Sequence, residues 1–428
     1  MRSPSSATAH LLLSAVLGIG FFAVPIPWNG SWTVLFDVAV KAVTKGFPTL
    51  VGVYCLGLIA FGAARWKSDE WKLGILRAIG LGLAIAFFFE IGPAWLTEKR
   101  VGGLMWGVLV FSVGVIIPVG AAALNVMVSY GLIELVGTWM RPIMRPLFRL
   151  PGRAAIDDLM SWLGSYSVGL YVTRKLTDDG RYTRRESYII VTCFSTVSIG
   201  FVGVVASTLN LLPIFPVVFG TYFVVVYVLA AILCRTWPVT SIPDTYLGAP
   251  DPESESGTGW SLAMERARTA PSIHIVAGEG LKDGVLLASS ILGTILAVGT
   301  AALLIAYNTP VFEVLGAPLV PVLAAMGFDD AAVLAPAVLA GITEMYIPAI
   351  LAKDAAVEGR FFICVLSISQ LIFFSSVAPM MLDMFRDLPV KFAHLVAIFL
   401  IRTALLIPMI AAITWVLGWS GVFGVLVD

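Results

Sequence analysis

The stretch from Gly341 to Pro379, GITEMYIPAILAKDAAVEGRFFICVLSISQLIFFSSVAP, decides the fold. It starts as an apolar leg that carries one acid, Glu344. It continues through a short charged loop into a second apolar run, which is interrupted at Ser375-Ser376. We interpret this layout as a hairpin followed by a helix that is broken at its serines.

An earlier stretch, Gly164 to Gly200, has the same layout and reads GSYSVGLYVTRKLTDDGRYTRRESYIIVTCFSTVSIG. Gly164 and Ser198 are 34 positions apart, and so are Gly341 and Ser375. Duplicated units of a hairpin and a broken helix, at matching points in the two halves of a chain, are typical of membrane transporters and mark their binding sites. The duplication therefore predicts both an architecture and the place of a site.

The composition indicates a protein of the lipid bilayer. Of the 428 residues, 59% are hydrophobic and only 13% are charged, whereas a soluble domain carries about 25% charged residues. The formal charge of zero gives no sign of nucleic-acid binding, so we expect no nucleic-acid partner. The four cysteines and three histidines are scattered without the spacing of metal ligands, so we expect neither a metal site nor a bound cofactor.

Apolar runs of about 20 residues predict spanning helices. We predict an all-α polytopic membrane protein with about eight transmembrane helices plus two re-entrant hairpins, Ala154–Thr173 and Ala331–Ala352. An amphipathic helix, Trp32–Phe47, should lie in the membrane interface. The remaining apolar segments are Ala9–Pro25, Pro48–Ala64, Leu73–Trp95, Gly103–Gly137, Glu186–Leu211, Pro213–Leu233, Leu281–Tyr307, Pro310–Met326, Phe361–Met384 and Phe392–Leu417.

Lysine and arginine are unevenly distributed between the loops. If the amino terminus is cytoplasmic, 20 of them face inside and six face outside, as the positive-inside rule requires. The first hairpin then opens to the cytoplasm and the second to the outside, which makes the two units an inverted repeat. We divide the chain into N-terminal transmembrane helices (1–102), a first repeat with the first hairpin (103–235), a polar cytoplasmic linker (236–280) and a second, inverted repeat (281–428).

The two hairpin tips are the candidate binding site. The first leg of each hairpin has ten residues, which is about 15 Å of helix and half of the hydrocarbon core. Both tips should therefore reach the bilayer midplane, and the glycine that begins each tip, Gly164 or Gly341, should permit the chain reversal because it tolerates a positive φ. The breaks in the following helices, at Cys193–Ser198 and Ser375–Pro379, should meet the tips at similar depth. Carbonyls and hydroxyls that are freed there suit a sodium ion or a polar solute. The predicted solute-binding residues are Ser165, Ser167, Thr343, Glu344, Ser375 and Ser376. The residues predicted to bind or couple an ion, sodium or a proton, are Ser195, Thr196, Ser198 and Arg402.

Two alternatives stay open at this stage. Serine and glycine in membrane helices often serve only close packing or bond to their own backbone. Glu344 is an intramembrane acid and is a functional residue by default, but it could instead form a structural ion pair with Arg402, the one cation deep inside a predicted span. Both roles can coexist, because an ion pair formed in one conformation can be a gate in another.

The segments PGRAAIDDLMSWLGSYSVGL…DGRYTRRESYIIVTCFSTVSIGF and GITEMYIPAILA…FFSSVAP resemble the nucleoside-recognition Gate-domain membrane proteins, in particular the YjiH-type family. The likeness covers most of the chain. Concentrative nucleoside transporters, the iron-transport protein FeoB and spore-maturation membrane proteins share the Gate segment, and the resemblance implies hairpins that seal a midplane solute site. Concentrative transporters carry a Gln-Thr-Glu type signature at the first tip, where this chain has Gly164-Ser165-Tyr166-Ser167 and lacks the acid.

We therefore expect a multi-pass transporter of the inner membrane that moves a small polar solute, nucleoside-like by resemblance, by alternating access. Ion coupling and a homo-oligomer are part of this expectation. A non-transporting scaffold or sensor with a Gate-type fold is the alternative. An enzyme is not expected, because the chain has no GxxxxGK[ST] motif for ATP and no histidine at the predicted midplane beside Ser165 and Ser167.

Overall fold

Helices make up almost all of the regular structure in the computed structural model, which describes residues 8–12, 16, 25–28, 31–65, 71–163, 166–247 and 259–426. The exception within these ranges is a small antiparallel hairpin of β1 (Pro25–Trp28) and β2 (Ser31–Val34). Most of the predicted helix Ala9–Pro25 lies outside the described residues. The predicted interfacial helix is shorter than expected, because α2 (Leu35–Gly46) begins only after β2.

Four helices in the described part are long and apolar enough to cross a membrane: Lys99–Met127, Leu212–Leu233, α14 (Ile273–Asn308) and α21 (Phe392–Trp419). A fifth span results if the bent pair Val38–Gly46 and Pro48–Ala64, which meet at 97°, crosses as one unit. The protein is therefore a multi-pass membrane protein. The described residues provide four or five candidate spans, fewer than the eight that we predicted.

Turn residues explain where the predicted spans are cut short. The run predicted at Leu73–Trp95 ends as α4 (Trp71–Phe88), since Glu90 has φ 55° just after the helix, and Gly92-Pro93 then prevents its continuation. The run predicted at Gly103–Gly137 divides at Gly131, which has φ 88°. Glycine adopts this left-handed conformation without the cost that a Cβ would impose.

The remaining elements include those that form the spans Lys99–Met127 and Leu212–Leu233. They are α3 (Pro48–Ala64), α5 (Ala94–Thr97), η2 (Lys99–Val110), α6 (Phe111–Ser129), α7 (Leu132–Phe148), α8 (Ala154–Leu163), α9 (Tyr166–Asp178), α10 (Arg184–Ile189), η3 (Ile190–Phe194), α11 (Ile199–Thr208), η4 (Leu212–Ile214), α12 (Phe215–Leu233), η5 (Val239–Ser241), α13 (Gly259–Thr269), α15 (Val311–Gly316), η7 (Ala317–Leu319), α16 (Val320–Ala325), α17 (Ala331–Ala340), α18 (Ile347–Leu351), α19 (Val357–Gln370), α20 (Val377–Met384) and η8 (Val422–Leu426).

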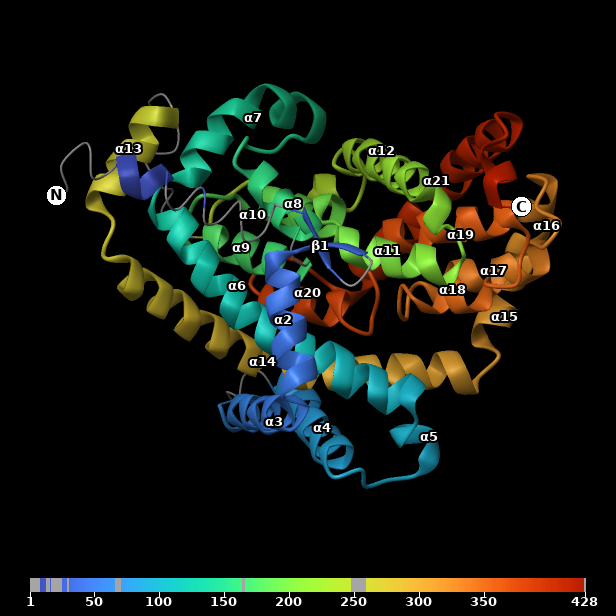
Figure 1. The fold of residues 1–428 in the computed structure, drawn as a ribbon, viewed down its shortest axis with the longest axis horizontal. Coiled ribbons are helices and arrows are strands. Elements are labelled where there is room, and N and C mark those ends of the chain that lie inside the picture. The colour runs from blue at the N-terminus through green and yellow to red at the C-terminus, as the bar shows by residue number, and fades with distance from the viewer. Residues whose placement is uncertain are drawn as a thin grey trace.

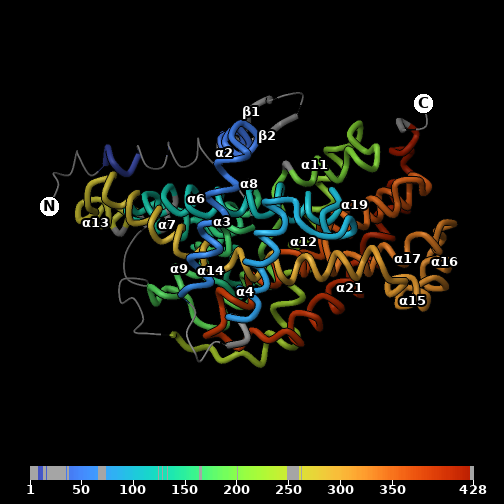
Figure 2. The backbone as a smooth tube through the Cα atoms, turned by 90° about the horizontal axis from the view of Figure 1, so that it is seen from below, coloured from blue at the N-terminus to red at the C-terminus, as the bar shows by residue number. Residues whose placement is uncertain are grey.

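The long helix α14 organises the arrangement. Figure 1 shows it running across the whole molecule, with α3 and α4 on one side and the helices that contain the two duplicated stretches on the other. It packs against α6, α4, α3 and α20. Viewed from below, α13 lies near one end of the molecule and α15 to α17 lie near the other (Figure 2).

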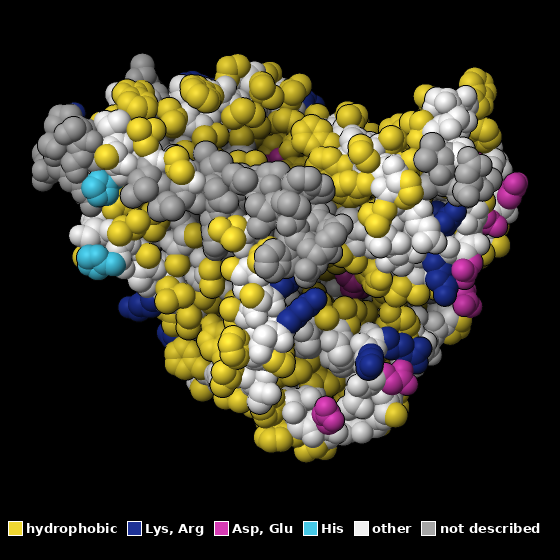
Figure 3. All heavy atoms as spheres, viewed as in Figure 1, with side chains coloured by type: hydrophobic (Ala, Val, Ile, Leu, Met, Phe, Trp, Pro, Cys, Tyr) yellow, Lys and Arg dark blue, Asp and Glu magenta, His cyan; other side chains and the backbone are white. Residues whose placement is uncertain are grey.

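The outer surface is largely apolar. Large hydrophobic side chains such as Phe47, Leu50 and Val224 are more than half exposed, and apolar side chains cover much of the face seen in Figure 3. Exposure of this kind is expected where lipid replaces water as the solvent. The exposed apolar surface thus indicates contact with the lipid bilayer.

The segment 236–280, predicted to be a polar linker, contains regular structure. It includes α13 and the first turns of α14, while residues 248–258 lie outside the described part. Helix α13 forms because Ala263 and Ala267 on one of its faces are fully buried and pack with Leu11. Because the segment as a whole is polar, its composition did not predict this narrow apolar stripe.

Candidate functional site

The turn of the second hairpin meets the break in the second broken helix. Residues 341–346 connect α17 to α18, and residues 371–376 separate α19 from α20. The backbone amide of Phe374 donates to the Ile342 carbonyl and that of Ser375 donates to the Thr343 carbonyl, both at 2.7 Å. The two non-helical segments therefore satisfy each other's backbone groups, as buried backbone must.

The break differs in position from its prediction. We predicted an interruption at Ser375–Pro379, whereas the non-helical residues are 371–376 and Leu371 has φ 60°. Pro379 lies in the first turn of α20, where its missing N–H leaves no helical hydrogen bond unmade.

Gly341 has a different role from the one that we predicted. Its φ is −56°, so it does not provide the reversal through a left-handed backbone. A Cβ at this position would instead lie 1.9 Å from Oε1 of Gln370. The Gln370 amide, which is 1% exposed, donates from Nε2 to the Val338 carbonyl (2.8 Å) and to Thr403 Oγ1 (2.9 Å). Close approach of this amide explains the glycine.

Glu344 is buried in the turn, with 3% of its surface exposed. Its Oε2 accepts a hydrogen bond from the Tyr346 amide. The ion pair with Arg402 that we considered is not formed: within the described residues, Glu344 has no cationic partner. Burying a carboxylate without a counter-ion costs folding free energy, so its presence in this position indicates a functional role.

The first hairpin reaches the same place. Its tip residues Gly164 and Ser165 lie outside the described residues, but Tyr166 and Ser167 begin α9. The hydroxyls of Tyr166 and Ser376 are 2.7 Å apart, and the Tyr166 ring contacts Phe373 edge-on with centroids 5.7 Å apart. Ser167 is 1% exposed and its hydroxyl donates to the sulfur of Met380 at 3.7 Å. The return leg of the first hairpin therefore lies against the second break.

The remaining predicted solute-binding residues lie at this junction but differ in their hydrogen bonds. Ser375 and Ser376 are completely buried at the break, and the Ser375 hydroxyl has no hydrogen-bond partner within the described residues. Thr343 is 5% exposed, but its hydroxyl donates to the Ala340 carbonyl of its own helix at 2.7 Å. The structure thus brings Ser167, Thr343, Glu344, Ser375 and Ser376 together.

The first break lies between η3 and α11, where residues 195–198 are not helical. Ser195 donates to the Ile190 carbonyl at 2.9 Å. Ser198 is the N-cap of α11 and accepts from the Phe201 amide at 3.4 Å. Thr196 donates to Oδ1 of Asp158 at 3.4 Å. The two serines thus serve the local backbone, while Thr196 connects the break to the first hairpin.

Two buried acids in α8 were not among the predicted site residues. Asp157 and Asp158 are 1% and 5% exposed. Asp157 accepts hydrogen bonds from the hydroxyls of Thr173 (2.7 Å) and Tyr182 (2.5 Å), and Asp158 accepts one from Tyr227. Their partners lie up to 69 positions away in the chain, so the local sequence carries no signal of this burial.

Arg402 joins the two breaks. This residue of α21 is completely buried. Its Nη1 donates to the carbonyls of Thr192 (3.0 Å) and Cys193 (3.2 Å), which precede the first break. Its Nη2 and Nε donate to the carbonyl of Ser369 (2.7 and 3.3 Å), which precedes the second. The guanidinium therefore occupies carbonyls that we had expected to suit a sodium ion, and its positive charge disfavours a cation there.

Comparison with known proteins relates this chain to one family and to one full-length relative. Residues 110–212 match the Gate family, which is described as nucleoside recognition. The chain is also 31% identical over 430 residues to an uncharacterized protein of Alkalihalophilus pseudofirmus, and the match covers 93% of this chain and 92% of the relative. This chain belongs to the Gate-domain family of membrane proteins. No solved structure matches it.

The Gate match covers the first duplicated unit only. It runs from the end of η2 to the start of η4 and so includes α8, α9 and the first break. Glu344, Ser376 and Arg402 lie outside the match, so the part of this Gate-domain protein that completes the junction comes from the other half of the chain. Within the described residues, no group of three or more His, Cys, Asp or Glu side chains is placed to hold a metal ion.

Proposed function

We propose that this Gate-domain protein is a secondary transporter of the inner membrane, of the YjiH type, which moves a small, nucleoside-like solute by alternating access. In this proposal the amino terminus is cytoplasmic, the two units are inverted re-entrant repeats, and transport is coupled to sodium or protons. Ser165, Ser167, Thr343, Glu344, Ser375 and Ser376 bind the solute, while Ser195, Thr196, Ser198 and Arg402 serve ion coupling or the change of conformation.

Glu344 is the observation that carries the proposal. Its carboxylate is buried, has no cationic partner in the described part of the chain, and lies where both duplicated stretches meet. A carboxylate accepts hydrogen bonds from two vicinal hydroxyls, as a ribose presents them. The ring of Tyr166 provides an aromatic surface, and every nucleobase can stack on such a surface. The Ser375 hydroxyl, which has no hydrogen-bond partner within the described residues, adds a donor.

The scaffold alternative rests on Arg402. Because the guanidinium satisfies the carbonyls at both breaks, this part of the protein can be stable and closed without a solute. A scaffold needs this closure, but it has no need for Glu344, a buried acid without a cationic partner in the described part of the chain. Glu344 therefore favours transport over the scaffold.

Equilibrium binding tests the proposal, with uridine and adenosine as probes on the purified protein in lipid nanodiscs. We expect both probes to bind and Glu344→Gln to weaken binding by about tenfold or more, because a hydrogen bond to a charged group is lost. The control is Glu358→Gln, which removes an exposed acid from the first turn of α19. Normal melting of Glu344→Gln is expected, as no ion pair is broken.

Two results would contradict the proposal. If neither probe binds, the solute is not nucleoside-like. If binding occurs but Glu344→Gln and Glu358→Gln bind equally well, the junction is not the site. Repeating the titration with and without sodium, and at two pH values, separates the two coupling ions.

A further inference from the structure

A second feature of the molecule lies at the far ends of α9 and α20. A cavity of about 600 Å³ is bounded by residues of α3, α4, α9, α14 and α20, among them Arg77, Tyr171, Arg174 and Asp383. Its volume is in the range of small-molecule sites. Tyr171 lines this cavity with 5% of its surface exposed, and its hydroxyl makes no hydrogen bond within the described residues. An unpartnered phenol in a cavity wall is available to a polar molecule.

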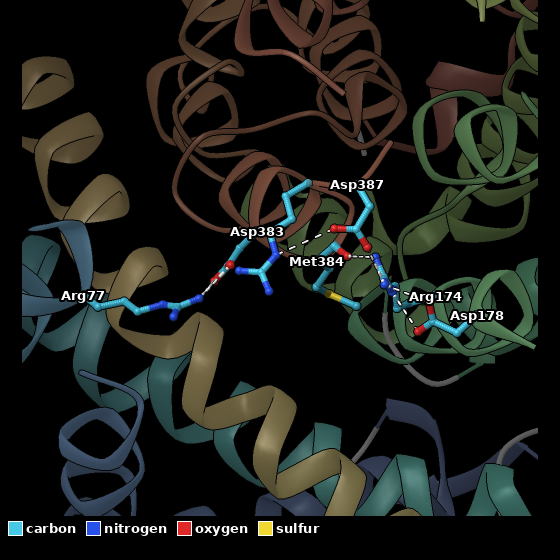
Figure 4. A network of polar contacts seen from close by, with 7 residues as sticks. Arg77, Arg174, Asp178, Asp383, Met384 and Asp387 are labelled. Atoms are coloured by element: carbon cyan, nitrogen blue, oxygen red, sulfur yellow. Dashed lines mark hydrogen bonds and ion pairs between the residues drawn. The ribbon is translucent and has the colours of Figure 1, made fainter. Parts of the chain in front are cut away.

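Two arginines hold the end of α20 across this cavity. Arg77 of α4 donates from Nη2 to both carboxylate oxygens of Asp383, at 2.8 and 3.1 Å, in a pair that is almost fully buried. Arg174 of α9 approaches from the other side (Figure 4). It donates to the Met384 carbonyl and to Asp387, each at 2.7 Å.

The arrangement places the charges where they act on the helix. Met384 is the last residue of α20, and its carbonyl has no partner within the helix. A cation at a helix C-terminus is also favoured by the helix dipole. Arg174 is kept in position by Asp178, one turn further along α9 at 2.7 Å. Arg77 and Arg174 thus connect α20 to two otherwise separate helices.

The cavity and the candidate site lie at opposite ends of the same two helices. Helix α20 has eight residues, Val377–Met384, which corresponds to about 12 Å. On α9, Ser167 lies at the junction and Arg174 at the cavity, seven residues or about 10 Å apart. A route from the junction along α9 and α20 therefore leads to this cavity.

We propose that the cavity is the cytoplasmic mouth of the solute pathway and that Arg77 and Arg174 are positioning residues, which hold α20 closed between this mouth and the junction. Breaking the contacts of Arg174 releases the end of α20, and the movement exposes Ser376 at its beginning. This inference rests on the proposed function for the identity of the pathway. The contacts themselves require no solute.

Cysteine labelling in inside-out vesicles tests the inference, with a membrane-impermeant methanethiosulfonate as the probe. Ser290→Cys reports on the cavity wall, and Ser376→Cys, at a completely buried position, reports on the junction. The four native cysteines are buried and provide the background rate. We expect Cys at 290 to react in every background, and Cys at 376 to react about tenfold faster when Arg174→Gln is added.

The matched control is Arg100→Gln, which breaks an exposed 2.6 Å pair with Glu98. Equal labelling of position 376 in the Arg174→Gln and Arg100→Gln backgrounds overturns the proposal that Arg174 holds α20 closed. Labelling of position 290 only from the opposite membrane face overturns the cytoplasmic mouth. If Arg174→Gln does not fold, Arg174→Lys replaces it, and a rate no higher than the Arg100→Gln control then refutes the proposal. Because labelling needs no solute, failure of nucleoside binding leaves this result intact, and the converse also holds.

Discussion

Arg402 is the residue whose removal should test the architecture most directly. Replacing it by methionine keeps an unbranched apolar chain and removes the guanidinium. Three buried carbonyls, those of Thr192, Cys193 and Ser369, then lose their donor. A buried polar group without a partner costs about 1–3 kcal/mol, so the three together cost roughly 3–9 kcal/mol.

The low end of this range applies, because the substitution also removes a buried charge that has no carboxylate partner in the described part of the chain, and so relieves its desolvation. We expect Arg402→Met to lower the free energy of unfolding by about 3 kcal/mol. Arg402→Lys should recover only part of this loss, since a compact ammonium cannot reproduce the planar fork that reaches both breaks.

The assay is chemical unfolding in detergent micelles, followed by the fluorescence of the 12 tryptophans. Arg100→Met is the control, because its exposed ion pair with Glu98 should contribute less than about 1 kcal/mol. A loss below about 1 kcal/mol for Arg402→Met would refute the reasoning that the guanidinium stabilises both breaks. In the double variant with Glu344→Gln, the two effects should add within about 0.5 kcal/mol, since the residues form no ion pair.

Two further predictions follow from the packing and the topology. Gly299→Ala should destabilise the protein by about 1–3 kcal/mol, because a Cβ on this residue of α14 would lie 2.4 Å from the Ser375 carbonyl; a variant with wild-type unfolding would show that α14 does not pack closely on the break. Single cysteines at Lys175 and Lys353 should label from opposite membrane faces, as the inverted repeat requires, and labelling from one face would exclude it.

Much of this protein follows from local properties of the chain. The low content of charged residues implies a bilayer, and apolar segments such as α3 (Pro48–Ala64) have the predicted bounds. The two non-helical segments, 195–198 and 371–376, each contain the serines from which a break was predicted. These features depend on residues that are neighbours in sequence, so composition and spacing are sufficient to predict them.

The partners of the buried polar groups depended on the tertiary structure. Arg402 bonds to carbonyls 210 and 33 positions away, and Tyr166 meets Ser376 across 210 positions. Glu344 and Arg402 are suitable ion-pair partners by charge, yet each bonds to backbone groups instead. The partner of a buried charge depends on the direction of its side chain. It also depends on which backbone groups without a helical partner are brought close by packing. Neither is encoded by the residues beside it in the sequence.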